Sequence, residues 1–129
     1  MAKQIIHTDA APAAVGPYSQ AVVAGQGKTV YLSGQIGLEP ETGELVSENF
    51  EGQVRQSFAN MQAVIKAAGG TLQSIVKLTL FLTDLSKFAS ANAIMADVIP
   101  QPYPARSTIG VANLPKGAQF EVEAVIVVQ

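Results

Sequence analysis

Hydrophobic and polar positions along this chain repeat with two periods, one typical of helices and one typical of strands. From about residue 50 to 68 the apolar side chains recur every three or four positions, which predicts a helix with one buried face. Gly69-Gly70 follows, and glycine readily adopts the left-handed conformation in which many helices end. The predicted buried face comprises Val54, Phe58, Met61, Ile65 and Ala68.

A second helix is predicted after Asp84, whose side chain can cap the first turn. Prolines at positions 100, 102 and 104 end this helix, because proline lacks the N–H that a helix interior needs. Spacings of three and four residues place one stripe of this helix against the core. The stripe comprises Leu85, Phe88, Asn92, Met95 and Ile99.

Alternation with a period of two predicts strands in the rest of the chain. Ala21–Ala24 and Thr29–Ile36 flank Gly25-Gln26-Gly27-Lys28, which favours a hairpin between them. A third segment, Ile75–Thr83, should place Val76, Leu78, Leu80 and Leu82 on one face. Two further strands are predicted at Arg106–Val111 and Gln119–Val128.

The predicted order is β-β-β-α-β-α-β-β, which indicates an α+β fold in a single domain, residues 1–129. Two helices on one face of a mixed six-stranded sheet give a two-layer structure. The last strand is apolar on both faces, since Val125 and Val127 lie beside Glu121 and Glu123 on the face opposite Phe120. Strands that are apolar on both faces need cover on both, so self-association is expected.

Composition narrows the classes of function. Hydrophobic residues make up 48% of the chain, and the net charge is −2 with scattered lysines and arginines. Nucleic-acid binding usually needs a basic patch, so it is not expected. Without cysteine there is no thiolate chemistry, and His7 as the sole histidine makes a histidine metal site or a Ser-His triad unexpected. No signal peptide or membrane span is recognised, which predicts a cytoplasmic protein without a membrane partner.

Arg106 is the most distinctive candidate for chemistry. It follows Pro102-Tyr103-Pro104-Ala105, and the prolines restrict this approach to extended conformations. A guanidinium so placed can bind a carboxylate through two parallel hydrogen bonds. The alternative, which spacing alone favours, is a structural ion pair with Glu121 or Glu123.

Several other polar residues remain open to two interpretations. Glu121 and Glu123 project from the same strand face, where they are either an acid–base pair or part of a solvated surface. Tyr18 offers a phenolic donor or packs a turn. Asn92 on the apolar stripe is interpreted as a clamp on neighbouring loop backbone, because a buried amide must be hydrogen-bonded. In Ser33-Gly34-Gln35 the glycine permits close approach of a ligand or backbone.

Taken together, nine segments in order resemble the Rid (YjgF/YER057c/UK114) family of enamine/imine deaminases over essentially the whole chain. The motif that carries most weight is Pro104-Ala105-Arg106-Ser107-Thr108. The other segments are Gly16-Pro17-Tyr18-Ser19-Gln20-Ala21 after Ala11-Pro12, Ser33-Gly34-Gln35-Ile36, Pro40-Glu41-Thr42-Gly43-Glu44, Gln56-Ser57-Phe58-Ala59-Asn60, Ala67-Ala68-Gly69-Gly70, Thr83-Asp84-Leu85-Ser86-Lys87-Phe88, Leu114-Pro115-Lys116-Gly117-Ala118 and Glu121-Val122-Glu123-Ala124.

The resemblance implies a chorismate-mutase-like homotrimer with clefts between subunits. It implies hydrolysis of 2-imino acids, such as 2-iminopropanoate and 2-iminobutanoate, to 2-oxo acids and ammonia without cofactor or metal. By position, Arg106 would bind the substrate carboxylate, Glu121 would hold or activate the attacking water, and Tyr18 would close the pocket. Backbone groups near Gly34 and Thr108 would assist, with Ser33 and Asn92 as structural neighbours.

Two departures from the family pattern affect the pocket. Thr108 stands where many deaminases have cysteine, and Met95 stands where a tyrosine is expected. The helix end before the proline-rich run is also shortened. This changes the expected shape of one pocket wall and therefore the substrate preference. Two other functions remain possible from the sequence. One is non-catalytic binding of 2-oxo or amino acids in the same cleft, and the other is RNA cleavage, which the charge distribution disfavours.

Overall fold

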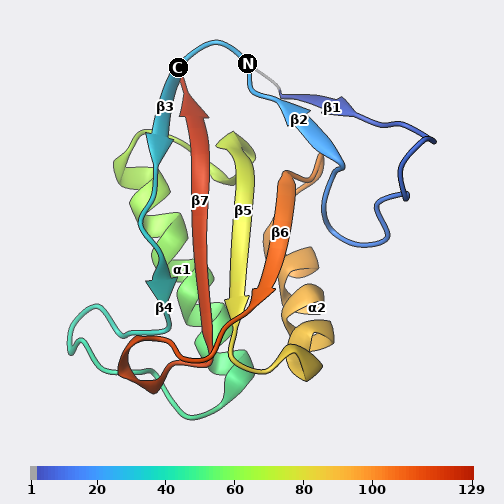
Figure 1. Cartoon of the computed structure of the whole chain (residues 1–129). Coiled ribbons are helices and arrows are strands. Elements are labelled where there is room, and N and C mark those ends of the chain that lie inside the picture. The colour runs from blue at the N-terminus through green and yellow to red at the C-terminus, as the bar shows by residue number, and fades with distance from the viewer. Residues whose placement is uncertain (1–2) are drawn as a thin grey trace.

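The computed structural model describes residues 3–129, which form a mixed sheet with both helices on one side of it (Figure 1). Residues 72–74, 85–87 and 115–117 form short 3-10 turns. The strands are β1 (Gln4–Ile6), β2 (Ala21–Val23), β3 (Lys28–Tyr31), β4 (Gln35–Ile36), β5 (Ile75–Leu82), β6 (Ala105–Gly110) and β7 (Phe120–Val128), and the helices are α1 (Phe50–Ala67) and α2 (Phe88–Val98).

The main sheet has five strands in the order β3-β7-β5-β6, with β4 also paired to β7. The pair β5–β6 is parallel and the others are antiparallel, so the predicted mixed sheet with two helices is confirmed. A single six-stranded sheet was wrong, because β1 and β2 form a separate two-stranded sheet. The core lies between the sheet and the helices and includes the fully buried Phe58, Met61, Leu78, Leu80, Met95 and Phe120.

The predicted hairpin between residues 21–24 and 29–36 is wrong in the structure. β2 pairs with β1 instead of β3, with Ile5 opposite Val22. The cause lies just before β2: the Ser19 amide donates to Pro104 O at 2.9 Å, and its hydroxyl donates to Tyr103 O. These bonds direct the chain to the β6 edge of the sheet, whereas β3 lies at the other edge (Figure 1).

Predicted elements elsewhere need smaller corrections. The segment predicted as one strand, 29–36, is interrupted after Tyr31 and resumes at Gln35. A register shift between Ile75 and Lys77 makes Val76 the extra residue, so Ile75 occupies the buried face that was assigned to Val76. Asp84 caps a 3-10 turn ahead of α2 rather than α2 itself, and Leu85 in that turn is 53% exposed instead of facing the core.

The face of β7 that points away from the helices is only half covered. Phe120, Val122 and Ile126 are fully buried under the helices, whereas Val125 and Val127 on the other face keep intermediate exposure. This confirms that β7 is apolar on both faces. Within residues 3–129 no helix has the length and apolar character to cross a bilayer. The same residues contain no cluster of three or more His, Asp or Glu side chains arranged to hold a metal ion.

Candidate functional site

Arg106 lies on the helix side of the sheet, at its β6 edge. It pairs in register with Leu78 of β5, which is fully buried under the helices, so the two side chains share that face. The guanidinium opens into a pocket of about 330 Å³ between β6, the first turns of α2 and the N-terminal segment. The pocket is lined by Val15, Tyr18, Phe88, Asn92, Arg106 and Thr108.

The guanidinium of Arg106 contacts polar and aromatic groups but no carboxylate. Nη1 donates to Asn92 Oδ1 at 2.7 Å and to Met95 Sδ at 3.5 Å. Its central carbon lies 4.8 Å from the ring centroid of Tyr18 and 5.2 Å from that of Phe88. Within residues 3–129 Arg55 pairs with Asp97, whereas Arg106 has no acidic partner, so the alternative of a structural ion pair between Arg106 and Glu121 or Glu123 is wrong.

Burial lowers the pKa of Arg106, with Tyr18 acting in the opposite direction. An arginine still remains protonated at neutral pH, since its ordinary pKa lies far above neutrality. The pocket therefore holds a partly desolvated positive charge that no acid of residues 3–129 neutralises. Such a group attracts an anion of a size that the pocket admits.

Asn92 has a different partner from the one predicted. Its carbonyl oxygen accepts from the Arg106 side chain, not from loop backbone as the sequence interpretation had it. The amide lies one turn of α2 after Phe88 and one before Met95, so three residues of the predicted apolar stripe face the guanidinium. The sequence signal was the stripe itself: its spacing assigned Phe88 and Met95 to the core, and only the family resemblance connected Met95 with the pocket.

Tyr18 is brought to Arg106 by its neighbour in the chain. Ser19 forms an isolated parallel bridge with Ala105, the residue before Arg106, so positions 18 and 106 lie close together. Gly16 also approaches the site: a β-carbon there would stand 3.6 Å from Arg106 Nη2. The sequence did not single out Gly16 alone, because its closeness depends on the bridge at Ser19.

Thr108 shares the Arg106 face of β6, two residues further along the strand. Its hydroxyl oxygen is buried and has no hydrogen-bond partner in the part of the chain that the structure describes. A buried hydroxyl without a partner is costly, which makes it a donor or acceptor available to a bound molecule. The side chain at this position therefore offers a group that the sequence analysis attributed to backbone only.

Glu121 lies on the opposite face of the sheet from Arg106. It pairs with Phe81 on the face away from the helices, and β5 separates its strand from β6. Burial raises the pKa of Glu121, and the neighbouring charge of Glu123 raises it further. The carboxyl group lies against Gly34, while Ser33 next to it is exposed.

One chain thus brings together Arg106, Tyr18, Asn92 and Thr108, but leaves Glu121 and Gly34 elsewhere. Arg106 and Glu121 occupy different faces and different strands of the sheet. A molecule bound to the guanidinium therefore does not reach the carboxyl group of the same chain.

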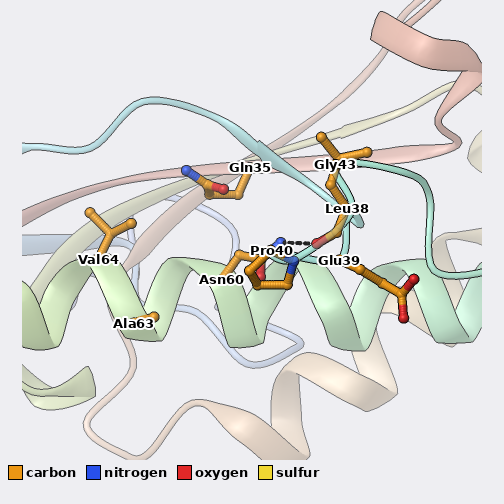
Figure 2. A pocket seen from close by; sticks show the side chains of 8 residues that line it. All are labelled: Gln35, Leu38, Glu39, Pro40, Gly43, Asn60, Ala63 and Val64. Atoms are coloured by element: carbon orange, nitrogen blue, oxygen red, sulfur yellow. Dashed lines mark hydrogen bonds between the residues drawn. The ribbon is translucent and has the colours of Figure 1, made fainter.

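A second pocket of about 350 Å³ lies between the β4 segment and α1 (Figure 2). Its walls are mostly apolar, and the amide of Asn60 is already bonded to Leu38 O at 2.9 Å and Ile36 O at 3.2 Å. The carboxyl group of Glu39 points away from the other lining residues in this view. This pocket offers less for chemistry than the one at Arg106, which holds a charge and a buried free hydroxyl.

Comparisons with known proteins match the whole described fold. The family model described as Endoribonuclease L-PSP matches residues 8–128. The 2-iminobutanoate/2-iminopropanoate deaminase of Dermatophagoides farinae is 44% identical over 127 residues, 98% of this chain and 98% of that protein. The Homo sapiens protein of the same name is 42% identical over 125 residues, 97% of this chain and 90% of its own. The crystal structure of RidA from an Antarctic Psychrobacter is 50% identical, with a TM-score of 0.76 over 97% of this chain and 99% of that one.

Proposed function

Because this chain belongs to the Endoribonuclease L-PSP family, also called the YjgF/Rid family, we propose that it hydrolyses reactive 2-imino acids to 2-oxo acids and ammonia. The substrates are of the 2-iminopropanoate and 2-iminobutanoate type, which relatives at 42–44% identity carry in their names. The observation that carries the proposal in this chain is the Arg106 guanidinium, half-buried in a pocket without an acidic partner.

Arg106 binds the substrate carboxylate in this proposal. A carboxylate neutralises the positive charge of the half-buried guanidinium. The hydrogen bonds between the two ions are charge-assisted and therefore roughly twice as strong as those between neutral groups. The rings of Tyr18 and Phe88 lie against the guanidinium and favour its positive charge. The Thr108 hydroxyl offers a further hydrogen bond to the bound molecule.

Hydrolysis needs one water molecule and proton transfers. The water oxygen adds to the imine carbon while its proton passes to a base, and the nitrogen takes up a proton. In the resulting carbinolamine the amino nitrogen takes up the proton that the base holds, the C–N bond breaks to release ammonia, and the hydroxyl proton returns to the base as the C=O bond of the 2-oxo acid forms. Glu121 serves as the base, because a carboxyl group with a raised pKa exchanges protons more readily near neutral pH.

Arg106 and Glu121 meet in this proposal across a subunit boundary, in a homotrimer with clefts between subunits. The support is that they occupy opposite faces of one sheet, so a second copy must supply the other group. The half-covered outer face with Val125 and Val127 is available for such contact. In the described part of the chain β3 has no second strand partner, and Tyr31 on it is 79% exposed.

The test couples this protein to a pyridoxal-phosphate threonine dehydratase, which releases the imine, and records the appearance of 2-oxobutanoate. We expect acceleration by the wild type and its loss in Arg106→Ala. If oxo-acid release is not accelerated, the deaminase proposal fails, and tight binding of 2-oxobutanoate under the same conditions identifies a non-catalytic binding protein. We further propose that the protein acts as one domain in the cytoplasm.

The family description also names an endoribonuclease, so RNA cleavage is part of the same test. The positive residues are scattered and the net charge is −2, which does not favour a nucleic-acid surface. A single-stranded RNA incubated with repurified wild type and Arg106→Ala distinguishes the two functions. Equal cleavage by both proteins excludes the Arg106 pocket as the nuclease site.

A further inference from the structure

The two hydrogen-bond acceptors next to Arg106 both accept from the same guanidinium nitrogen, Nη1. Nη1 donates to Asn92 Oδ1 at 2.7 Å and to Met95 Sδ at 3.5 Å. A guanidinium has five N–H donors, of which Nη1 carries two. The remaining donors, one on Nε and two on Nη2, have no partner among residues 3–129.

A guanidinium binds a carboxylate in two planar ways. In the end-on mode each terminal nitrogen contributes one N–H, and in the side-on mode Nε and Nη2 contribute one each. Because Asn92 and Met95 engage Nη1, the end-on mode would have to displace at least one of them. We propose that Asn92 and Met95 are positioning residues that reserve the side-on edge of Arg106, Nε and Nη2, for the substrate carboxylate.

This inference rests on the proposed function, since it specifies how the same site holds its substrate. The two positioning residues are fixed on α2, three positions apart, and therefore lie on the same helix face. Met95 is fully buried, so its sulfur has little freedom to move away from Nη1. Phe88 on the same face lies beside the guanidinium, which further restricts its rotation.

Gly16 keeps the open edge accessible. A β-carbon at position 16 would stand 3.6 Å from Arg106 Nη2 and 3.5 Å from Asn92 Nδ2, which is ordinary van der Waals contact. An alanine would therefore fit beside Nη2 without distorting the fold. Its methyl group would nevertheless occupy space next to the nitrogen that the substrate uses.

The test observes the arginine side chains directly by NMR during titration with 2-oxobutanoate. The chain has two arginines, so the Nε–H spectrum contains two signals, and Arg106→Lys assigns them. Arg55, which is exposed on α1 and pairs with Asp97 at 3.4 Å, is the internal control. We expect the Arg106 Nε–H signal to shift on binding and the Arg55 signal to stay. An unchanged Arg106 signal at saturating 2-oxobutanoate overturns the side-on mode.

Two variants test the positioning role. Asn92→Leu removes the oxygen acceptor at similar size, and Met95→Leu removes the sulfur at similar volume. We expect Asn92→Leu to weaken 2-oxobutanoate binding about 10-fold and to reduce the Nε–H shift, as loss of a hydrogen bond to a charged group would. Met95→Leu should weaken binding by a smaller factor. Wild-type Kd and an undiminished shift in both variants overturn the assignment.

These readouts separate this inference from the proposed function. Binding of the oxo acid requires no turnover, so a protein that shifts the Arg106 signal without accelerating imine hydrolysis keeps the side-on mode and loses the deaminase function. A protein that accelerates hydrolysis with an unchanged Arg106 signal keeps the function and loses the side-on mode. In steady-state assays, Asn92→Leu should raise KM more than it lowers kcat, because it loosens carboxylate binding and leaves the proton transfer intact.

Discussion

The carboxyl group of Glu121 lies directly against Gly34: a β-carbon at position 34 would stand 2.8 Å from Glu121 Cδ. Gly34 does not have a positive φ, so its backbone accommodates alanine, and the flexible glutamate must move instead. We expect Gly34→Ala to retain its thermal stability but to lose about 100-fold in kcat, as displacement of a catalytic group by about 1 Å does. Thermal unfolding and the dehydratase-coupled assay measure the two effects.

A matched control for this substitution is Gly52→Ala on α1. There the added β-carbon meets the flexible hydroxyl of Ser47 at 3.0 Å, away from the proposed site. Its activity should remain at the wild-type level. Equal activity of Gly34→Ala and Gly52→Ala would show that the position of the Glu121 carboxyl group does not matter for the reaction.

Arg106→Ala should reduce kcat/KM about 100-fold or more, because it removes the charge-assisted bonds to the substrate carboxylate. Arg106→Lys should have a kcat/KM only slightly above that of Arg106→Ala, since an ammonium group cannot form the planar two-bond contact. Both values come from the coupled assay at substrate concentrations below KM. Full activity in either variant contradicts carboxylate binding by the guanidinium.

The activity should depend on pH through Glu121, whose pKa is raised by burial and then by Glu123. Glu121 accepts a proton only when ionised, so kcat/KM should fall as the pH drops through this raised pKa, above the usual glutamate range. Glu123→Gln removes the nearby charge and should move this limb to lower pH. A profile that is identical in Glu121→Gln and wild type would exclude Glu121 as the titrating base.

The same shift has a consequence for folding. The folded state favours the protonated form of Glu121, so its contribution to stability is present at low pH and is lost as the pH rises through the raised pKa. Glu121→Gln should therefore make the unfolding free energy less dependent on pH in that range. Chemical denaturation of both proteins at several pH values measures this dependence of the unfolding free energy.

Tyr18 should act through its ring. Its centroid lies 4.8 Å from the central carbon of the Arg106 guanidinium, a separation at which the ring face attracts the cation. Tyr18→Phe keeps that contact and should leave KM near the wild-type value, whereas Tyr18→Ala should raise KM about 5-fold. If Tyr18→Phe is as impaired as Tyr18→Ala, the hydroxyl rather than the ring carries the effect.

The assembly is tested on the outer face of β7. Native mass spectrometry should give three times the chain mass of 13.5 kDa for the wild type. Val125→Lys places a charge on the half-covered face and should give monomers with little activity. Val64→Lys is the control, because Val64 is 40% exposed on the helix side. A monomeric wild type that is fully active would refute a site shared between subunits.

Sequence periodicity was sufficient for features that depend on near neighbours. The α1 pattern placed Val54, Phe58, Met61 and Ile65 correctly in the core, and Gly69 takes the expected positive φ of 87°. The two faces of β7 were also correct. These features follow from the repeat of a helix or a strand, which a single segment carries in its own residues.

Only the tertiary structure decided which segments meet. The bridge between Ser19 and Ala105 placed β2 away from β3, and no local pattern distinguishes that pairing from a hairpin. Asn92 found its partner in Arg106 because α2 packs beside the β6 edge.

The separation of Arg106 from Glu121 follows from the registers of β5 with β6 and with β7. The sequence by itself determined which faces are apolar, and it predicted which residues carry chemistry. Strand register and chain crossing are set by contacts between residues far apart in the sequence, and therefore only the folded chain determined that its guanidinium and its carboxyl group face opposite sides of the sheet.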